Sequence, residues 1–303
     1  MDLDIVIVGG GPAGLNAALV LGRARKRVLL CDAGAPRNAA AAHIHNFVTR
    51  DGTPPAEFRR VAHAELAAYP SVQRRELGVV GIEARGPGHL VVTLADGSSV
   101  TARRVLLCVG VIDLLPALPG LAPLWGKQVH VCPYCHGWEM QGLRTGYLCP
   151  DAAWLEWALL LSSWTREVVV FTGGDYAVAP DVRGRLAQAG VMLEERPVTR
   201  LIGEETLAGA LMADGSRVAI EALYVRPQQR QTALVAGLGL ALDELGYVKV
   251  DEHRQTSVPG IYAAGDLTTM VQAAGLAAAA GMFAAAMINH GLTVELALAG
   301  ALD

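Results

Sequence analysis

The chain begins with a glycine-rich turn placed between a short apolar strand and a helix. Residues 4–9 are a β-branched run, which is typical of a strand buried on both faces. Residues 15–22 have a helical composition, and residues 27–32 form a second apolar run that ends in an acid, Asp32. A strand, a glycine turn, a helix and a second strand in this order predict a dinucleotide-binding βαβ unit.

Each glycine of the turn, Gly9-x-Gly11-x-x-Gly14, has its own task in such a unit. Gly9 permits the tight turn, Gly11 lets the backbone approach a pyrophosphate, and Gly14 lets the helix and the strand pack closely. The helix N-terminus supplies N–H donors and positive potential to the phosphates, and Asp32 is placed to accept hydrogen bonds from ribose hydroxyls. The alternative is a purely structural turn in a doubly wound fold. The motif by itself does not distinguish FAD from a nicotinamide dinucleotide.

The rest of the sequence predicts a second α/β region inside the first. A length of 303 residues suits two domains, and Asp-Gly turns at 96–97 and 214–215 predict hairpins. A late strand ends in Gly265-Asp266, and a second acid over the same site suits a longer, flavin-containing ligand. We therefore predict an α/β fold with two Rossmann-like, three-layer (ββα) dinucleotide-binding domains. The first comprises residues 1–114 and 231–303, and the second, residues 115–230, is inserted into it.

The composition excludes several classes of protein. The net charge is −4 and Lys and Arg form no long basic block, so a nucleic-acid partner is not expected. The N-terminus lacks the basic region of a signal peptide, and five unevenly spaced cysteines do not resemble a secreted disulfide framework. The apolar stretch 273–288 is short for a membrane span and rich in Ala and Gly, so a closely packed buried helix is expected. These features predict a cytoplasmic protein with no membrane partner.

The motif Cys132-Pro-Tyr-Cys135-His136 fits three chemistries. It matches a redox-active disulfide, one half of a zinc site, and the C-x-x-C-H pattern of covalent haem attachment. Haem attachment takes place outside the cytoplasm, and no export signal is found. Zinc could recruit His130 as well, but structural zinc sites usually draw on two separated pairs and there is no second C-x-x-C. A redox disulfide is therefore the favoured interpretation, and no metal is predicted.

The local chemistry also favours a disulfide. In a C-x-x-C motif that starts a helical turn, the backbone N–H groups and the helix dipole stabilise a thiolate, and Pro133 suits the first helical position. His136 is predicted to carry protons during thiol–disulfide exchange, although it could instead only hydrogen-bond the turn. The other cysteines, Cys31, Cys108 and Cys149, are expected to be small buried hydrophobes on strands.

The glycine turn, the central C-x-x-C motif and residues 260–266 followed by Gln272-Ala273 together resemble the low-molecular-weight thioredoxin reductases, over nearly the whole sequence. The resemblance implies FAD in the first domain, a homodimer, and a disulfide on the inserted domain facing the flavin. It also implies that Cys132 reacts with the substrate and that Cys135 lies against the flavin. The cofactor-binding residues implied in this way are Gly9, Gly11, Pro12, Ala13, Gly14, Asp32, Ala33, Arg37, Asn38, His45, Asn46, Gly110, Gly265, Asp266, Gln272 and Ala273.

The sequence departs from that family where NADPH should bind. The second glycine fingerprint is replaced by residues 145–154, in which Pro150, Ala153 and Trp154 stand where glycines would let a pyrophosphate approach. The strand that should end in a His-Arg-Arg clamp for the 2′-phosphate ends in Thr172-Gly-Gly174. This combination resembles a branch that includes the dithiol oxidases of gliotoxin- and holomycin-type pathways and ferredoxin-linked reductases. Residues 37–38 and 43–46 resemble the flavin-proximal segment of those oxidases.

The resemblance leads to one main hypothesis and one alternative. The first is an NADPH-independent FAD enzyme that oxidises a small-molecule dithiol through Cys132 and Cys135, with oxygen as electron acceptor. The alternative is a reductase of a disulfide or of a thioredoxin-like protein, fed by ferredoxin or, less expectedly, by NADPH. Both use the same residues, with electrons flowing in opposite directions.

Overall fold

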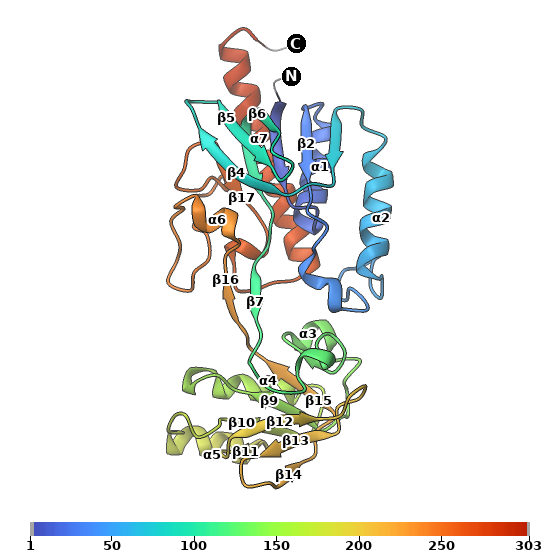
Figure 1. The fold of residues 1–303 in the computed structure, drawn as a ribbon, viewed down its shortest axis with the longest axis vertical. Helices are drawn as coiled ribbons and strands as arrows, with labels where there is room; N and C mark the ends of the chain where they lie inside the picture. The colour runs from blue at the N-terminus through green and yellow to red at the C-terminus, as the bar shows by residue number, and fades with distance from the viewer. Residues whose placement is uncertain (1–2, 302–303) are drawn as a thin grey trace. The chain divides into compact units, whose positions relative to one another are not determined.

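The computed structural model describes residues 3–301, which fold into two compact units (Figure 1). The first unit contains both ends of the protein, and the second is formed by the middle of the sequence together with a short early segment. Their bounds are Met1–Ala39, Asn46–Ile112 and Gln229–Asp303 for the first unit, and Ala40–His45 and Asp113–Gln228 for the second. The early segment places His45 and Asn46, which are neighbours in sequence, in different units. The domain borders drawn from the sequence, after residues 114 and 230, remain a prediction.

The first unit is built on a mainly parallel sheet whose central strand is β1. The strand order is β3-β2-β1-β6-β5-β4, with β17 also paired in parallel to β6. Strands β4, β5 and β6 pair antiparallel, which confirms the predicted hairpin at Asp96-Gly97. The strands are β1 (Leu3–Val8), β2 (Val28–Cys31), β3 (Val72–Arg75), β4 (Val79–Ala84), β5 (Leu90–Leu94), β6 (Ser99–Leu107) and β17 (Ile261–Ala263).

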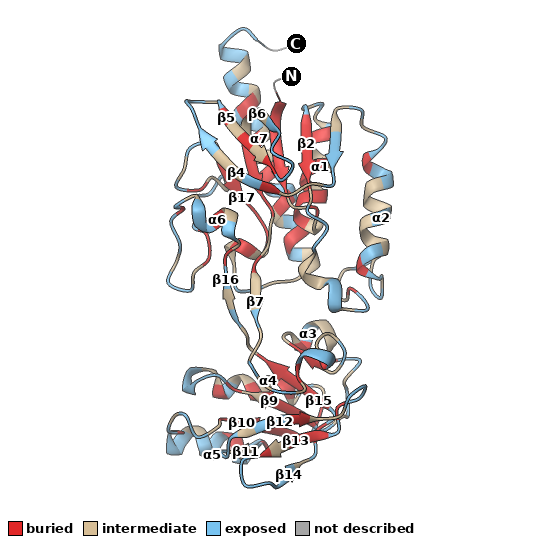
Figure 2. Cartoon of the chain, in the orientation of Figure 1, coloured by how far each residue is buried: buried red, intermediate tan, exposed pale blue. Residues whose placement is uncertain are grey.

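Alternate residues of β1 face two different cores, so this strand is buried on both sides (Figure 2). Ile5 and Ile7 pack against the helices α1 and α7, whereas Val6 and Val8 pack with residues of β5 and of the segment around Tyr247. The helical segments of the unit are α1 (Pro12–Arg23), η1 (Arg37–Ala40), α2 (Pro55–Leu66), α6 (Ala233–Gly237), η4 (Asp266–Thr268) and α7 (Ala274–Leu298).

Helix α7 packs closely on helix α1. Its buried positions recur on one face, and a Cβ on Gly281 would overlap the backbone oxygen of Ala13. This agrees with the close packing expected for residues 273–288. Among the described residues, α7 is the one helix long and apolar enough to cross a membrane, a test that buried helices of globular proteins also pass.

The second unit is also built on a parallel sheet, and its antiparallel strands form a separate sheet. Its sheet has the order β11-β10-β9-β15-β8, and all of these pairs are parallel. One face is covered by the antiparallel strands β12, β13 and β14, and the other by η3, α4 and α5. The strands are β8 (Val129–His130), β9 (Thr145–Leu148), β10 (Val168–Phe171), β11 (Met192–Glu194), β12 (Val198–Ile202), β13 (Gly209–Met212), β14 (Arg217–Val218) and β15 (Ala222–Val225). The helical segments are η2 (Ala122–Leu124), α3 (Pro133–His136), η3 (Ala152–Trp157), α4 (Ala158–Leu161) and α5 (Pro180–Gln188).

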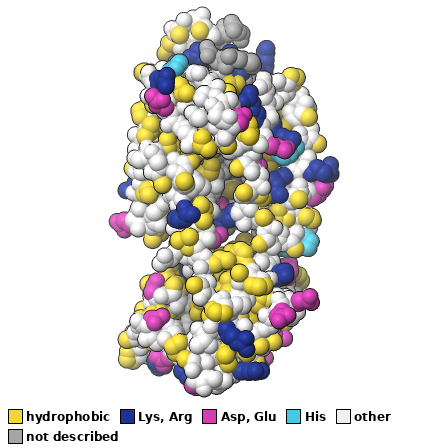
Figure 3. Space-filling model, viewed as in Figure 1, with side chains coloured by type: hydrophobic (Ala, Val, Ile, Leu, Met, Phe, Trp, Pro, Cys, Tyr) yellow, Lys and Arg dark blue, Asp and Glu magenta, His cyan; other side chains and the backbone are white. Residues whose placement is uncertain are grey.

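The backbone passes between the units through two short paired strands, β7 (Ile112–Leu114) and β16 (Gln228–Arg230). The second of these crossings lies next to Gln228, the last residue of the second unit. On the face drawn in Figure 3, Lys and Arg side chains are interspersed with Asp and Glu. Several charged side chains of the protein form exposed short-range pairs, such as Arg60–Glu57 at 2.6 Å, and pairs of this kind contribute little to stability.

Candidate active site

The glycine turn of the first unit joins β1 to α1 at the carboxyl edge of the sheet. Gly9 has φ +108°, a conformation that side chains rarely adopt. A Cβ on Gly14 would overlap the backbone oxygen of Gly9, whereas a Cβ on Gly11 would meet nothing within 4 Å. Gly11 caps α1 with no side-chain hydrogen bond, and Pro12 takes the first helical position. The first N–H groups of α1 therefore face open space with no side-chain cap, an arrangement that suits a pyrophosphate.

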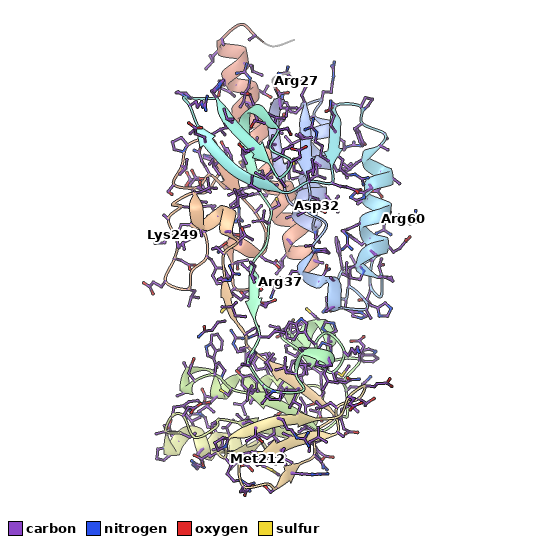
Figure 4. The ribbon with its side chains drawn as sticks, in the orientation of Figure 1. Arg27, Asp32, Arg37, Arg60, Met212 and Lys249 are labelled. Atoms are coloured by element: carbon purple, nitrogen blue, oxygen red, sulfur yellow. The ribbon has the colours of Figure 1, made fainter. Side chains whose placement is uncertain are left out.

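Asp32 lies directly beside this turn, at the end of β2 (Figure 4). A Cβ on Gly10 would stand 2.5 Å from the Asp32 carboxylate oxygen, so the glycine makes room for the acid. His63, on α2, has a buried Nε2 with no hydrogen-bond partner among residues 3–301. Burial lowers the pKa of His63, and the nearby Asp32 carboxylate opposes that effect. The Asp32 carboxylate next to the glycine turn fits the hydroxyl-rich end of a dinucleotide.

Arg37 contacts Asp266 and Gln272, two residues of the segment that follows strand β17. Arg37 Nη1 lies 3.0 Å from Asp266 Oδ2 and donates to Gln272 Oε1 at 2.6 Å. Gly265 has φ +91°, and a Cβ there would press on Ala13 at 3.1 Å. The 25-residue helix α7 begins immediately after Gln272, with Ala273 as an N-cap that offers no side-chain hydrogen bond. A second uncapped helix N-terminus therefore borders the same glycine-lined region.

The remaining predicted cofactor residues are distributed over both units. Ala33 and Asn38 follow β2, and Gly110, with φ +64°, follows β6, all in the first unit. Asn46 also belongs to the first unit and has φ +58°. His45 instead belongs to the second unit, where its Nε2 lies 3.5 Å from Glu139 Oε1. In the first unit, the uncapped N–H groups, the open cradle at Gly11 and the adjacent Asp32 fit FAD.

The cysteine motif lies in the second unit. Cys132 is the N-cap of the one-turn helix α3, Pro133 takes the first helical position, and the Cys135 backbone N–H donates to the Cys132 carbonyl at 3.2 Å. Both cysteines are half-buried. A Cβ on Gly137 would stand 2.7 Å from the ring of Trp164, so glycine is required where the turn passes that side chain. The predicted helical turn with Pro133 at its start is confirmed.

The histidine of the motif belongs to a row of imidazole rings. His136 stacks on His130, with ring centroids 4.0 Å apart and an interplanar angle of 14°. His45 stands edge-on to His136 at 6.2 Å, and His43 lies 6.0 Å from His45. Both ring nitrogens of His136 are buried and have no hydrogen-bond partner among the residues that the structure describes. The alternative role for His136, holding the turn by a hydrogen bond, is therefore not seen.

Burial sets the charge of this histidine pair. It lowers the pKa of His136, helped by the nearby His45 and opposed by Glu139. It also lowers the pKa of His130 to about 3, although the ring bonds the Lys127 carbonyl at 2.8 Å. Burial raises the pKa of Tyr224, with Cys132 and Cys135 close enough to add to the effect. At neutral pH the rings of His130 and His136 are therefore uncharged. No group of three or more His, Cys, Asp or Glu side chains is arranged to hold a metal among residues 3–301.

Strand β9 lies between β10 and β15 in the second unit, as β1 lies between β2 and β6 in the first. The turn after β9 therefore corresponds to the glycine turn after β1. It is closed by its own side chains. The Asp151 carboxylate accepts the Ala153 N–H at 2.9 Å and so caps η3. A negative charge and an occupied donor therefore stand where a pyrophosphate would need free N–H groups.

Aromatic side chains fill the neighbouring space. The Arg226 guanidinium, just after β15, lies 3.4 Å from the centre of the Trp154 ring and 5.8 Å from that of Trp157. The Tyr176 hydroxyl donates to the Cys149 carbonyl at 3.1 Å. Residues Thr172–Gly174, after β10, bring no cation, and Thr172 is buried. This edge of the sheet is therefore packed with protein groups.

Sequence reasoning missed three of these features. His130 was weighed only as a zinc ligand, whereas it stacks on His136. No local motif marks Arg226 and Tyr224, which lie about 90 residues from the cysteines in the sequence.

Cys31, Cys108 and Cys149 are buried as expected, with Cys31 on a strand and the other two just after one. Burial raises the pKa of the Cys31 thiol to about 11.

Comparisons with known proteins agree with this architecture. The family model for pyridine nucleotide-disulphide oxidoreductases matches residues 3–284. Thioredoxin reductase sirT of Leptosphaeria maculans is 31% identical over 309 residues, covering 94% of this chain and 93% of its own. An oxidoreductase structure from Agrobacterium tumefaciens superposes with a TM-score of 0.92 at 34% identity, covering 97% of this chain and 99% of that one. The structure of HlmI gives a TM-score of 0.92 at 35% identity, covering 99% and 95%.

Proposed function

We propose that this chain, a member of the pyridine nucleotide-disulphide oxidoreductases, is an NADPH-independent dithiol oxidase. The chain is a flavin-dependent, thioredoxin reductase-like disulfide oxidoreductase that binds FAD. In this proposal a small dithiol gives its electrons to Cys132 and Cys135, and oxygen finally receives them. The glycine turn, Asp32, Asp266 and α7 of the first unit would hold the FAD.

One observation carries the proposal: the second nucleotide turn is capped by Asp151 and covered by the Trp154–Arg226 stack. A pyrophosphate would have to displace the carboxylate from the Ala153 N–H and would meet its negative charge. It would also have to displace an indole held by a cation. In this proposal NADPH is not the electron donor, and electrons reach the cysteine pair from a thiol.

The chemistry consists of two thiol–disulfide exchanges. With Cys132 and Cys135 joined, one substrate thiolate attacks the sulfur of Cys132, the S–S bond breaks, and Cys135 leaves as a thiolate. The second substrate thiolate then attacks the substrate sulfur bonded to Cys132, so the product disulfide forms and Cys132 is released. The substrate loses two electrons and two protons, and the cysteine pair takes up the electrons. FAD, held by the glycine turn, Asp32 and Asp266, would supply the acceptor for these two electrons, and oxygen would take them up with two protons to give hydrogen peroxide.

Histidines are suited to the proton transfers. Thiol–disulfide exchange requires a thiolate, so each substrate thiol must lose a proton to a nearby base. His136 follows Cys135 directly, and its two ring nitrogens are buried without partners among residues 3–301. Burial keeps the ring neutral by lowering its pKa, so it can accept a proton at neutral pH. His130, stacked behind it, keeps the ring in place.

An anaerobic titration of the bound flavin tests the proposal. We expect dithiothreitol to bleach the visible flavin band rapidly and NADPH to bleach it slowly or not at all. Readmitted oxygen should restore the band and form one hydrogen peroxide for each dithiol oxidised. Cys135→Ser should abolish bleaching by dithiol while FAD stays bound. Rapid bleaching by NADPH with none by dithiol would overturn the proposal.

A second candidate, a disulfide reductase fed by a protein donor, is supported by the thioredoxin reductase names of relatives such as sirT. It uses the same cysteines with the electron flow reversed. Reduced ferredoxin and oxidised thioredoxin, supplied together without oxygen, test it directly. Thioredoxin reduction in that assay, with no oxygen consumption when dithiothreitol is the donor, would favour the reductase.

A further inference from the structure

Two glutamine side chains of the first unit form a reciprocal amide pair. Gln229 Nε2 donates to Gln272 Oε1 at 3.0 Å, and Gln272 Nε2 donates to Gln229 Oε1 at 2.9 Å. The residues are 43 positions apart, on β16 and just before α7. Both side chains are part-buried, so water competes less for these bonds than at an open surface.

Groups at both ends fix the pair in one orientation. Arg37 Nη1 donates to Gln272 Oε1 at 2.6 Å, and the Gln272 amide nitrogen also donates to the Thr269 carbonyl at 2.9 Å. The hydroxyl of Tyr247, a buried side chain, donates to Gln229 Oε1 at 2.8 Å. Because a guanidinium only donates, Gln272 must present its oxygen to Arg37 and its nitrogen to Gln229. The amide of Gln272 therefore cannot turn over without losing several bonds.

The position of Gln272 gives this arrangement a consequence for the cofactor. Gln272 connects η4, which begins at Asp266, to the uncapped N-terminus of α7. A tilt of its backbone would move the first N–H groups of that helix, which border the FAD site. Gln229, 43 residues away in the sequence, helps to hold Gln272 in place through the reciprocal hydrogen bonds. No sequence motif marks Gln229.

We propose that Gln229 is a positioning residue for FAD: through Gln272, it holds the start of α7 and thereby sets the environment at the flavin end of the bound cofactor. The proposal rests on FAD occupying the first unit and not on the identity of the electron donor. Its failure is therefore distinguishable from a failure of the proposed dithiol oxidase activity.

The test compares Gln229→Ala with Gln188→Ala, a glutamine at the exposed end of α5. FAD affinity is measured by titrating the apoprotein, and the visible spectrum and midpoint potential of the bound flavin are recorded. We expect Gln229→Ala to weaken FAD binding by about tenfold, the size of one or two lost hydrogen bonds. It should also shift the flavin absorption band and the potential. Gln188→Ala should leave all three quantities unchanged.

Two further variants keep the proposal open to refutation. Gln272→Ala removes the group that Gln229 is proposed to hold, so it should shift the spectrum in the same direction. If Gln229→Ala fails to fold by circular dichroism, Tyr247→Phe decides, because it removes a single hydrogen bond from Gln229 Oε1. The proposal would be overturned if the folded Gln229→Ala protein had the same flavin spectrum, midpoint potential and FAD affinity as the wild type. If Gln229→Ala does not fold, the same result in Tyr247→Phe would overturn it.

Discussion

Each of the two units has a turn that follows the central strand of a parallel array, β1 in the first and β9 in the second, and the two turns are built differently. In the first unit, the positions of the turn after β1 that lie very close to other protein atoms, Gly9, Gly10 and Gly14, are glycines. Helix α1 starts without a side-chain cap. In the second, the turn after β9 contains Pro150, and Asp151 caps the helical segment that follows. A parallel sheet with flanking helices therefore does not by itself make a nucleotide site. Whether the first helical N–H groups are free, and whether side chains cover them, governs how well such a turn can bind a pyrophosphate.

The sharpest way to break this comparison is to damage the first turn. In Gly14→Ala the added Cβ would overlap the Gly9 carbonyl oxygen, so α1 must move away from the turn. Overpacking of this kind costs about 1–3 kcal/mol, and we expect FAD affinity to fall by roughly 100-fold at the upper end. Titration of the apoprotein with FAD measures the loss.

Gly184→Ala provides the matched control in the second unit. Gly184 lies within α5, and its Cβ would meet nothing within 4 Å. This variant should bind FAD as the wild type does, and stability should rise by about 0.5–1 kcal/mol because alanine favours a helix over glycine. If Gly14→Ala bound FAD normally, close packing at the first turn would not be what makes it a nucleotide site.

A second prediction concerns the indole that covers the turn of the second unit. Trp154 is half-buried against the core that includes Leu155 and Tyr147, and it stacks on Arg226. Trp154→Ala should destabilise the second unit by about 2 kcal/mol, less than the cost for a fully buried tryptophan. It should not create NADPH binding, because Asp151 still caps the helical segment.

Intrinsic fluorescence can follow the second unit alone, because all five tryptophans lie in it: Trp125, Trp138, Trp154, Trp157 and Trp164. Flavin release reports the first unit separately. Trp138→Ala, at a side chain that is 71% exposed, should change the free energy of unfolding in urea by less than about 0.5 kcal/mol. Tight NADPH binding by Trp154→Ala would mean that the ring, and not the capped turn, excludes the dinucleotide.

Much of this contrast could be predicted from the sequence because it depends on local chemistry. A glycine between a strand and a helix, or a proline and a tryptophan in its place, affects the conformation of the turn and the start of the helix within a few residues. The first unit's turn, the hairpins at Asp96 and Asp214, and the helical turn at Pro133 were predicted for that reason, and the structure confirms them.

Contacts between distant parts of the sequence could not be predicted in this way. Arg226 reaches Trp154 across the sheet, and Gln229 reaches Gln272 across 43 residues. His45 and Asn46 were predicted together as cofactor residues, yet they fall in different units because the segment 40–45 packs with the middle of the sequence. Side-chain chemistry identifies candidates, but only the packed fold decides which candidates meet.

The buried histidines of the second unit also predict that this unit loses stability in acid. The pKa of His130 is about 3 in the folded protein, well below the ordinary value of a histidine, because the ring is buried. Below about pH 6.5 the unfolded protein therefore binds one more proton than the folded one, and stability is lost as the pH falls towards 3. The slope is about 1.4 kcal/mol per pH unit, and His136 acts in the same direction. Urea unfolding followed by tryptophan fluorescence at pH 7 and pH 5 should show a loss of about 2 kcal/mol.

Replacing the ring tests the origin of that loss. His130→Phe keeps a flat ring against His136 but cannot take up a proton, so stability should depend less on pH by about one proton. His253→Phe, at an exposed position of the first unit, is the control, because the tryptophan signal reports the second unit alone. The same slope in wild type and His130→Phe would mean that another group causes the acid sensitivity.

The smallest expected effect comes from the cap itself. Asp151→Ala removes the acceptor of the Ala153 N–H, and loss of an N-cap costs about 1 kcal/mol. Asp151→Asn keeps an acceptor oxygen and removes the charge, so its stability should stay close to wild type. We expect neither variant to let NADPH bleach the flavin, because the Trp154–Arg226 stack still covers the turn. If Asp151→Asn gained that reaction while Asp151→Ala only lost stability, the carboxylate charge alone would be what separates the second turn from the first.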